Sequence, residues 1–190
     1  MDTTLVVPGL KGSDVDHWQS WFERKIPNCI RVVQRDWNSA NLPDWSAKLR
    51  RELNRAPGRI WIVAHSFGCL ATVQTAFDYR ERISGLMLVA PADPEKFGLR
   101  GQITEVPLGM PSVVVASTND PWMSFDRAAA LAETWGAEFV NIGAAGHINP
   151  RAGFGPWPHG LEIYRRLRQA SAWPYATRDI DELSFHLEDI

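Results

Sequence analysis

Short apolar runs alternate with amphipathic stretches along most of the chain. The run Ile60–Ala64 is apolar throughout, which is typical of a strand buried on both faces of a parallel sheet. In the stretch 14–25, Trp18, Trp21 and Phe22 recur at helical spacing and form one apolar stripe. The same patterns predict strands at 3–7, 30–33, 59–65, 83–90, 112–116 and 138–142, and helices at 14–25, 43–55, 67–79, 125–135 and 161–170.

This alternation predicts an α/β fold, with a mainly parallel sheet of about six strands and helices on both faces. The length of 190 residues fits one domain, which we place at 1–172, followed by an acidic tail at 173–190. In the tail, Ile180, Leu183 and Leu187 recur at helical spacing. We expect this stripe to pack on its own domain or to form a dimer contact.

Charge and cysteine content disfavour several classes of partner. The 20 basic and 22 acidic residues give a net charge of −2, so nothing favours nucleic acid or an anionic membrane. The two cysteines, Cys29 and Cys69, predict neither a disulfide framework nor a metal site. The chain shows no membrane-span pattern and no secretory signal. We expect a cytoplasmic monomer or weak homodimer that needs no cofactor and no metal.

Candidate chemistry lies where strands end, because ligands of parallel sheets bind outside the carboxyl ends of the strands. The segment Ala64-His65-Ser66-Phe67-Gly68 joins a predicted strand directly to a helix, and its small residues Ala64 and Gly68 permit a sharp turn. A serine at such an apex is strained and presents its hydroxyl, as in the nucleophile elbow of α/β hydrolases. The common pattern has glycine where Ala64 stands. The alternative is a serine that only caps the helix.

A serine nucleophile needs a general base, and the chain has five histidines. His65 adjoins the serine in a strand, so its side chain points to the opposite face. His17 falls on the polar side of the first predicted helix, and His186 lies in the tail. His147 stands in a glycine-rich loop directly after the sixth strand, which favours it over His159 near a helix start.

The base needs an acid that orients it, and two aspartates follow predicted strands. Asp120 follows the fifth strand, and Asp93 follows the fourth strand and is the rival. Asp120 precedes a proline, so it could also be an ordinary turn residue. With Asp120, the chain order Ser66, Asp120, His147 is that of α/β hydrolases, which favours Asp120 as the acid.

The remaining parts of such a site are oxyanion donors and a substrate pocket. We expect the backbone N–H groups of Phe67 and Leu10 to be the donors, since one opens a helix and the other lies in the loop after the first strand. Gly9 would let that loop approach the serine, and we place Gly9 and Trp122 in the pocket. The segment 91–110 is too short for a lid domain, which predicts a shallow pocket suited to short acyl chains.

Five segments together resemble a known family of small serine hydrolases, which includes the retinoblastoma-binding serine hydrolase and bacterial YdeN-like proteins. The resemblance extends over about residues 3–168 and implies a minimal α/β-hydrolase fold without a large lid domain. It also implies a catalytic triad of Ser66, Asp120 and His147. The segments are Val7-Pro8-Gly9, His65-Ser66-Phe67-Gly68, Ser117-Thr118-Asn119-Asp120-Pro121, Gly146-His147-Ile148-Asn149 and Gly155-Pro156-Trp157-Pro158-His159-Gly160.

The residues and the resemblance lead to one main functional hypothesis. We expect a carboxylesterase-like serine hydrolase that cleaves small esters, thioesters or amides through an acyl-enzyme, with a small acyl compound as substrate. Two alternatives stay open, a non-catalytic protein-binding module on the same fold and an acyltransferase.

Overall fold

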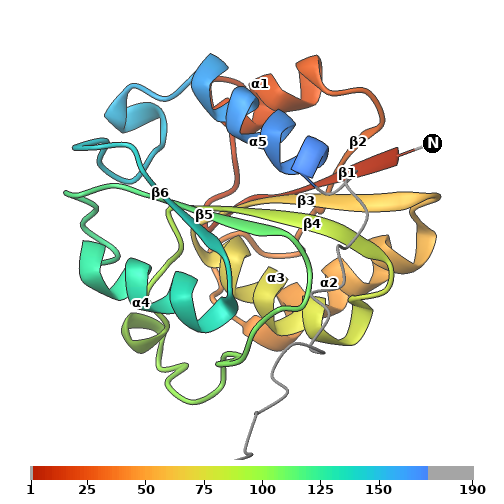
Figure 1. Ribbon diagram of the computed structural model, residues 1–190, viewed down its shortest axis with the longest axis horizontal. Helices are drawn as coiled ribbons and strands as arrows, with labels where there is room; N and C mark the ends of the chain where they lie inside the picture. Colours follow the sequence, from red (N-terminus) through yellow and green to blue (C-terminus); the bar gives the residue numbers. More distant parts are fainter. Residues whose placement is uncertain (1, 171–190) are drawn as a thin grey trace, which may run out of the picture.

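A six-stranded parallel sheet forms the centre of the protein (Figure 1), whose computed structural model describes residues 2–170. The strands lie in the order β2-β1-β3-β4-β5-β6, and every neighbouring pair is parallel. The predicted α/β fold is confirmed, with a sheet that is parallel throughout. The strands are β1 (Asp2–Val7), β2 (Cys29–Arg31), β3 (Arg59–His65), β4 (Ile83–Val89), β5 (Ser112–Ala116) and β6 (Glu138–Asn141).

Helices cover both faces of this sheet. Helices α1 (Trp18–Lys25) and α5 (Pro158–Ala170) lie on one face, and α2 (Leu42–Arg55), α3 (Phe67–Ala76) and α4 (Phe125–Trp135) lie on the other (Figure 1). Short 3₁₀ turns occur at η1 (Phe77–Tyr79), η2 (Pro94–Phe97) and η3 (Pro150–Ala152). As predicted, no part of residues 2–170 forms a separate lid domain.

The central strand β3 contributes to two separate hydrophobic cores. Ile60 and Ile62 are buried against α2 and α3, whereas Trp61 and Val63 are buried on the side of α1 and α5. Successive side chains of a strand point to opposite faces, so a strand between two layers of helices must be apolar at every position. The same alternation sends the side chain of His65 to the α1 and α5 side.

Helix α1 begins later than the sequence pattern predicts. It starts at Trp18 instead of residue 14, and its N-cap is His17, whose Nδ1 accepts a hydrogen bond from Gln19 N at 3.1 Å. Ser13, in the loop before the helix, donates its hydroxyl to Gln19 Oε1 at 2.6 Å. His17 was predicted on a polar helix face, and this was wrong, because its side chain is buried under the helix start.

Other boundaries differ by small amounts. The helix expected at 67–79 is α-helical only to Ala76, after which η1 completes it. Helix α5 begins at Pro158, before the expected residue 161, since proline is well suited to a first helical turn. The predicted tail at 173–190 lies outside the described residues.

The segment 91–110 is a packed connection with only a short part near the strand ends. Leu99, Ile103 and Leu108 are buried in the core beneath α2, α3 and α4. The turn η2 carries Phe97, whose ring centroid lies 5.2 Å from that of Phe67, the residue after Ser66. The segment is therefore held by its apolar side chains, and η2 is the part that borders the candidate site.

Candidate active site

Ser66 occupies a sharp turn between β3 and α3. Its backbone has φ 55° and ψ −124°, a region that residues with a side chain seldom adopt. Its N–H donates to the carbonyl oxygen of Val89 at 3.1 Å, which ties the turn to the neighbouring strand β4. A Cβ at Gly68 would overlap the carbonyl oxygens of Val7 and Pro8, so α3 approaches the end of β1 as closely as it does only because position 68 is glycine.

His147 lies between Ser66 and Asp120 in one hydrogen-bonded row. Its Nε2 is 2.8 Å from Ser66 Oγ, and its Nδ1 is 2.8 Å and 3.0 Å from the two carboxylate oxygens of Asp120. A carboxylate only accepts, so Nδ1 carries the hydrogen and Nε2 is left to accept the serine hydroxyl. This row can pass a proton from Ser66 to His147 while Asp120 stabilises the charge that forms.

The two rival residues lie elsewhere in the structure. Asp93 caps η2 by accepting from Glu95 N at 3.1 Å, and its carboxylate lies 3.5 Å from Arg127 Nε. His159 is exposed in the first turn of α5. The structure therefore brings Asp120, and not Asp93, to the imidazole of His147.

The glycine-rich loop that carries His147 is fastened to the loop that carries Asp120. Gly146 N donates to Asn119 Oδ1 at 2.7 Å, and Ala145 N donates to Ser117 Oγ at 2.9 Å. Ser117 Oγ in turn donates to Asn119 Oδ1 at 2.8 Å. No role was predicted for these two side chains, although the polar run directly before Asp120 was a signal for them.

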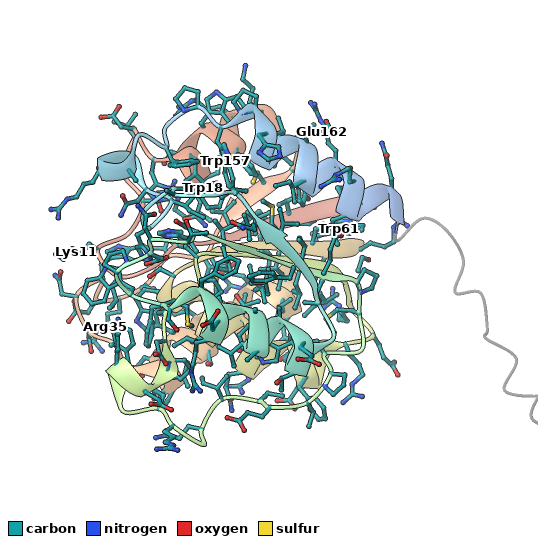
Figure 2. All side chains as sticks on the ribbon, turned by 60° about the vertical axis from the view of Figure 1, so that its left-hand side comes forward. Lys11, Trp18, Arg35, Trp61, Trp157 and Glu162 are labelled. Carbon is teal, nitrogen blue, oxygen red and sulfur yellow. The ribbon has the colours of Figure 1, made fainter. Side chains whose placement is uncertain are left out.

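On its other side, the same loop is held by side chains of α1 and β3. Trp18 Nε1 donates to the carbonyl oxygen of Ile148 at 2.9 Å, and His65 Nε2 lies 2.9 Å from the carbonyl oxygen of His147. Trp18 packs edge-on against Trp157, with ring centroids 5.2 Å apart, and Figure 2 shows both close to the start of α5. His65 was excluded as a base because its side chain points away from Ser66, but that side chain contacts the backbone of the candidate base.

The loop after β1 lies directly against the serine. A Cβ at Gly9 would stand 2.7 Å from Ser66 Cβ, closer than real Cβ contacts come. Leu10, with one of the predicted donor N–H groups, follows immediately. The other donor, Phe67 N–H, opens α3 and has no acceptor within its own helix. The predicted donors therefore belong to the two segments that flank Ser66.

Trp122 stands at the rim of the site. Its ring centroid is 6.3 Å from that of His147 and the residue is 49% exposed, so a substrate could reach it. Its N–H donates to Asp120 Oδ1 at 2.8 Å and helps to hold the carboxylate. Lys11, labelled in Figure 2 at the edge of the molecule, donates its backbone N–H to Trp37 O at 2.8 Å and so fastens the loop after β1.

Two further imidazoles line up behind His147. The ring centroids of His17 and His65 are 5.0 Å apart, and those of His65 and His147 are 4.9 Å apart. Burial lowers the pKa of His17 to about 4 and holds the pKa of His65 well below its usual range. Both are therefore neutral at neutral pH and place no positive charge behind His147.

Within residues 2–170, no three His, Cys, Asp or Glu side chains are grouped so that they could hold a metal ion. None of the helices in this part of the chain has the length and apolarity to cross a membrane. A cavity of about 370 Å³ lies at the amino ends of β1 and β3, away from Ser66, and is lined by Asp2, Arg59, Trp61, Arg165, Arg168 and Gln169.

Comparison with known proteins identifies the family. The profile of the family described as serine hydrolase matches residues 4–166. The chain belongs to this family. A protein from Pectobacterium atrosepticum, described as a YdeN-like hydrolase, shares 43% identity with this serine hydrolase, with a TM-score of 0.86 over 90% of this chain and 92% of that chain. The resemblance noted in the sequence is thereby confirmed.

More distant solved structures share the fold of this serine hydrolase. The ydeN gene product of B. subtilis is 18% identical, with a TM-score of 0.75 over 89% of this chain and 100% of that one. Est1E from Butyrivibrio proteoclasticus is 14% identical, with a TM-score of 0.67 over 90% of this chain and 87% of that one. A comparison with curated proteins finds no match.

Proposed function

We propose that this serine hydrolase cleaves small esters, thioesters or amides through a covalent acyl-enzyme, in the manner of a carboxylesterase. The observation that carries the proposal is the row in which Ser66 Oγ, the two nitrogens of His147 and the carboxylate of Asp120 follow one another at 2.8 Å. The strained backbone of Ser66 supports it, because strain of this kind is held at functional sites.

In the first half of the reaction, Ser66 Oγ attacks the carbonyl carbon of the substrate and its proton moves to His147 Nε2. The carbonyl oxygen becomes negatively charged and accepts hydrogen bonds from the N–H groups of Phe67 and Leu10. When the tetrahedral intermediate collapses, the bond to the leaving group breaks and His147 returns the proton to that group. An acyl ester of Ser66 remains.

In the second half, water replaces the leaving group. His147 Nε2 takes a proton from the water, whose oxygen attacks the acyl carbon, and the proton then returns to Ser66 Oγ as the acid product leaves. Throughout, Asp120 holds the Nδ1–H of His147 and stabilises the imidazolium. Every step uses side chains, backbone N–H groups and water, so the proposal requires neither a metal nor an organic cofactor.

The test is labelling of the purified protein with a fluorophosphonate probe, which reacts with activated serines and needs no knowledge of the substrate. We expect one probe molecule per chain in the wild type and none in Ser66→Ala. We also expect Ser66→Ala to lower hydrolysis of p-nitrophenyl acetate by at least about 10³-fold. Ser39→Ala, which removes an exposed serine hydroxyl far from the row in sequence, is the matched control.

Two results would contradict the proposal. Hydrolysis that persists in purified Ser66→Ala would show that Ser66 is not the nucleophile. A wild-type protein that is folded, unlabelled and inactive toward all three kinds of acyl substrate would favour a protein-binding role for the same surface.

A further inference from the structure

His65, the residue before the proposed nucleophile, contacts the backbone of the proposed base. Its Nε2 lies 2.9 Å from the carbonyl oxygen of His147, across 82 positions of sequence. Ser66 and His65 are consecutive, so one short stretch of chain touches His147 twice. Ser66 Oγ meets the imidazole of His147, and His65 meets its main chain.

The acceptor in this contact determines which nitrogen of His65 carries a hydrogen. A carbonyl oxygen only accepts hydrogen bonds, so His65 Nε2 must carry a hydrogen and donate it. The ring is packed against those of His17, Trp18 and His147, where burial disfavours a charged imidazolium. His65 is thus a neutral donor, and it does not compete with His147 as a base.

No helix or strand includes the loop that presents His147, so contacts with neighbouring segments must position it. It follows β6, a short strand of four residues at the edge of the sheet. Gly146 and Ile148, the residues on either side of His147, both have positive φ, at 54° and 47°. Such a conformation is costly for the β-branched Ile148, and it persists only where surrounding contacts hold it. By contrast, His65 ends β3, which lies between β1 and β4 in the interior of the sheet.

We propose that His65 is a positioning residue whose Nε2–H holds the main chain of His147, so that the imidazole stays in line with Ser66 Oγ. The inference rests on the proposed function of the row. This hydrogen bond ties the loop of His147 to β3, the strand that ends at His65 next to Ser66. Small displacements between reacting groups are costly, since a shift of about 1 Å can lower a rate by about 10²-fold.

The decisive comparison is between His65→Phe, which keeps a ring of similar shape without a donor, and His65→Gln, whose side-chain amide can donate near the position of Nε2. We expect His65→Phe to lower kcat for p-nitrophenyl acetate by about 10-fold to 100-fold with little change in KM, because His65 does not face the substrate. His65→Gln should recover most of this loss. His159→Phe, at an exposed position of α5, is the control and should behave as the wild type.

A second readout follows the hydrogen bond between His147 and Asp120 and does not need activity. The proton on His147 Nδ1 should give a low-field proton NMR resonance in the wild type. This resonance should disappear in His147→Gln. We expect the resonance to broaden or shift in His65→Phe and to return in His65→Gln. If His65→Phe fails to fold, His65→Met serves as the variant without a donor.

The inference is overturned if the variants without a donor keep the wild-type kcat and resonance, or if His65→Gln is as impaired as His65→Phe. Failure of the proposed function is distinguishable from this, since it would leave the wild type unlabelled and inactive. The NMR comparison would then still decide whether His65 holds His147.

Discussion

Gly9 lies against Ser66 so closely that a methyl group at position 9 would stand 2.7 Å from Ser66 Cβ and 3.3 Å from Ser66 Oγ. The loop after β1 must therefore move away from the serine if position 9 gains a side chain. That movement would displace the adjacent N–H of Leu10 from a developing oxyanion.

We accordingly predict that Gly9→Ala lowers kcat by about 10²-fold, as expected for the loss of one oxyanion donor. The measurements are kcat and KM for p-nitrophenyl acetate, together with a thermal melt. Gly101→Ala is the control, because position 101 has φ 70° but no atom within 4 Å of an added Cβ. That variant should lose about 1 kcal/mol of stability through backbone strain and keep its activity. A fully active Gly9→Ala protein would show that the second oxyanion donor is not the N–H of Leu10.

Asp120 and Asp93 provide a matched pair for testing the acid. Asp120→Asn removes the charge that would stabilise the imidazolium of His147, and the same change in a serine protease triad costs about 10⁴ in kcat. We predict a loss of about 10³-fold to 10⁴-fold for Asp120→Asn in steady-state ester hydrolysis. Asp93→Asn alters only the cap of η2 and its ion pair with Arg127, so its kcat should stay close to that of the wild type. A larger loss of kcat in Asp93→Asn than in Asp120→Asn would indicate that Asp93, in the loop after β4, is the acid.

Asn119 joins the loops that carry Asp120 and His147, the proposed acid and base. We predict that Asn119→Ala lowers kcat by about tenfold with little change in KM. Ser117→Ala should disturb the same loop, since Ser117 Oγ donates to Asn119 Oδ1 and also accepts from Ala145 N. The two changes should therefore be non-additive in a double-mutant cycle, with a coupling of about 1 kcal/mol. Thr118→Ala, at the exposed position between them, is the control. Strictly additive effects would show that the two side chains support the site independently.

Trp122 should set how the enzyme responds to acyl length. We predict that kcat/KM rises over the first few carbons of a p-nitrophenyl ester series and then levels off, because each buried methylene contributes about 0.8 kcal/mol only where an apolar wall meets it. Trp122→Ala should reduce the gain per methylene and leave the acetate ester nearly unaffected. The series is measured below micelle formation. A continued rise into long chains, or activation at a lipid interface, would indicate a deep pocket.

The buried imidazole of His17 makes stability depend on pH. Burial lowers its pKa in the folded state to about 4, below the ordinary value of 6.5, so the unfolded chain binds a proton between these values and the folded protein does not. The contribution is present above pH 6.5 and is lost as the pH falls toward 4. We predict that the titration of His17 contributes about 2 kcal/mol to the loss in free energy of unfolding between pH 7 and pH 5, measured by urea titration as the difference between the wild type and a variant without this imidazole. The buried His65, whose pKa is also lowered, adds to the loss in the wild type.

His17→Asn is the matched variant, because asparagine can still accept from Gln19 N as an N-cap but does not titrate. Its free energy of unfolding should fall less than that of the wild type over the same pH interval. Equal slopes in the two proteins would mean that other groups cause the acid sensitivity.

The sequence by itself determined the features that depend on neighbouring residues and on chain order. The unbroken apolar run of β3 predicted a strand between two layers, since alternate side chains must enter opposite cores. The small residues around Ser66 predicted a sharp turn. The order of Ser66, Asp120 and His147 pointed to three strand ends, which share one edge of a parallel sheet.

Tertiary structure decided what depends on segments far apart in the chain. Strand alternation gave the direction of His65 correctly, but only the fold shows that the backbone of His147 lies there. Likewise, His17 was predicted on a polar helix face, but α1 begins after it and its side chain is buried. Asp120 and Asp93 have similar local sequence positions. The hydrogen bonds that separate them join residues many positions apart, and such contacts leave no periodic trace in a single sequence.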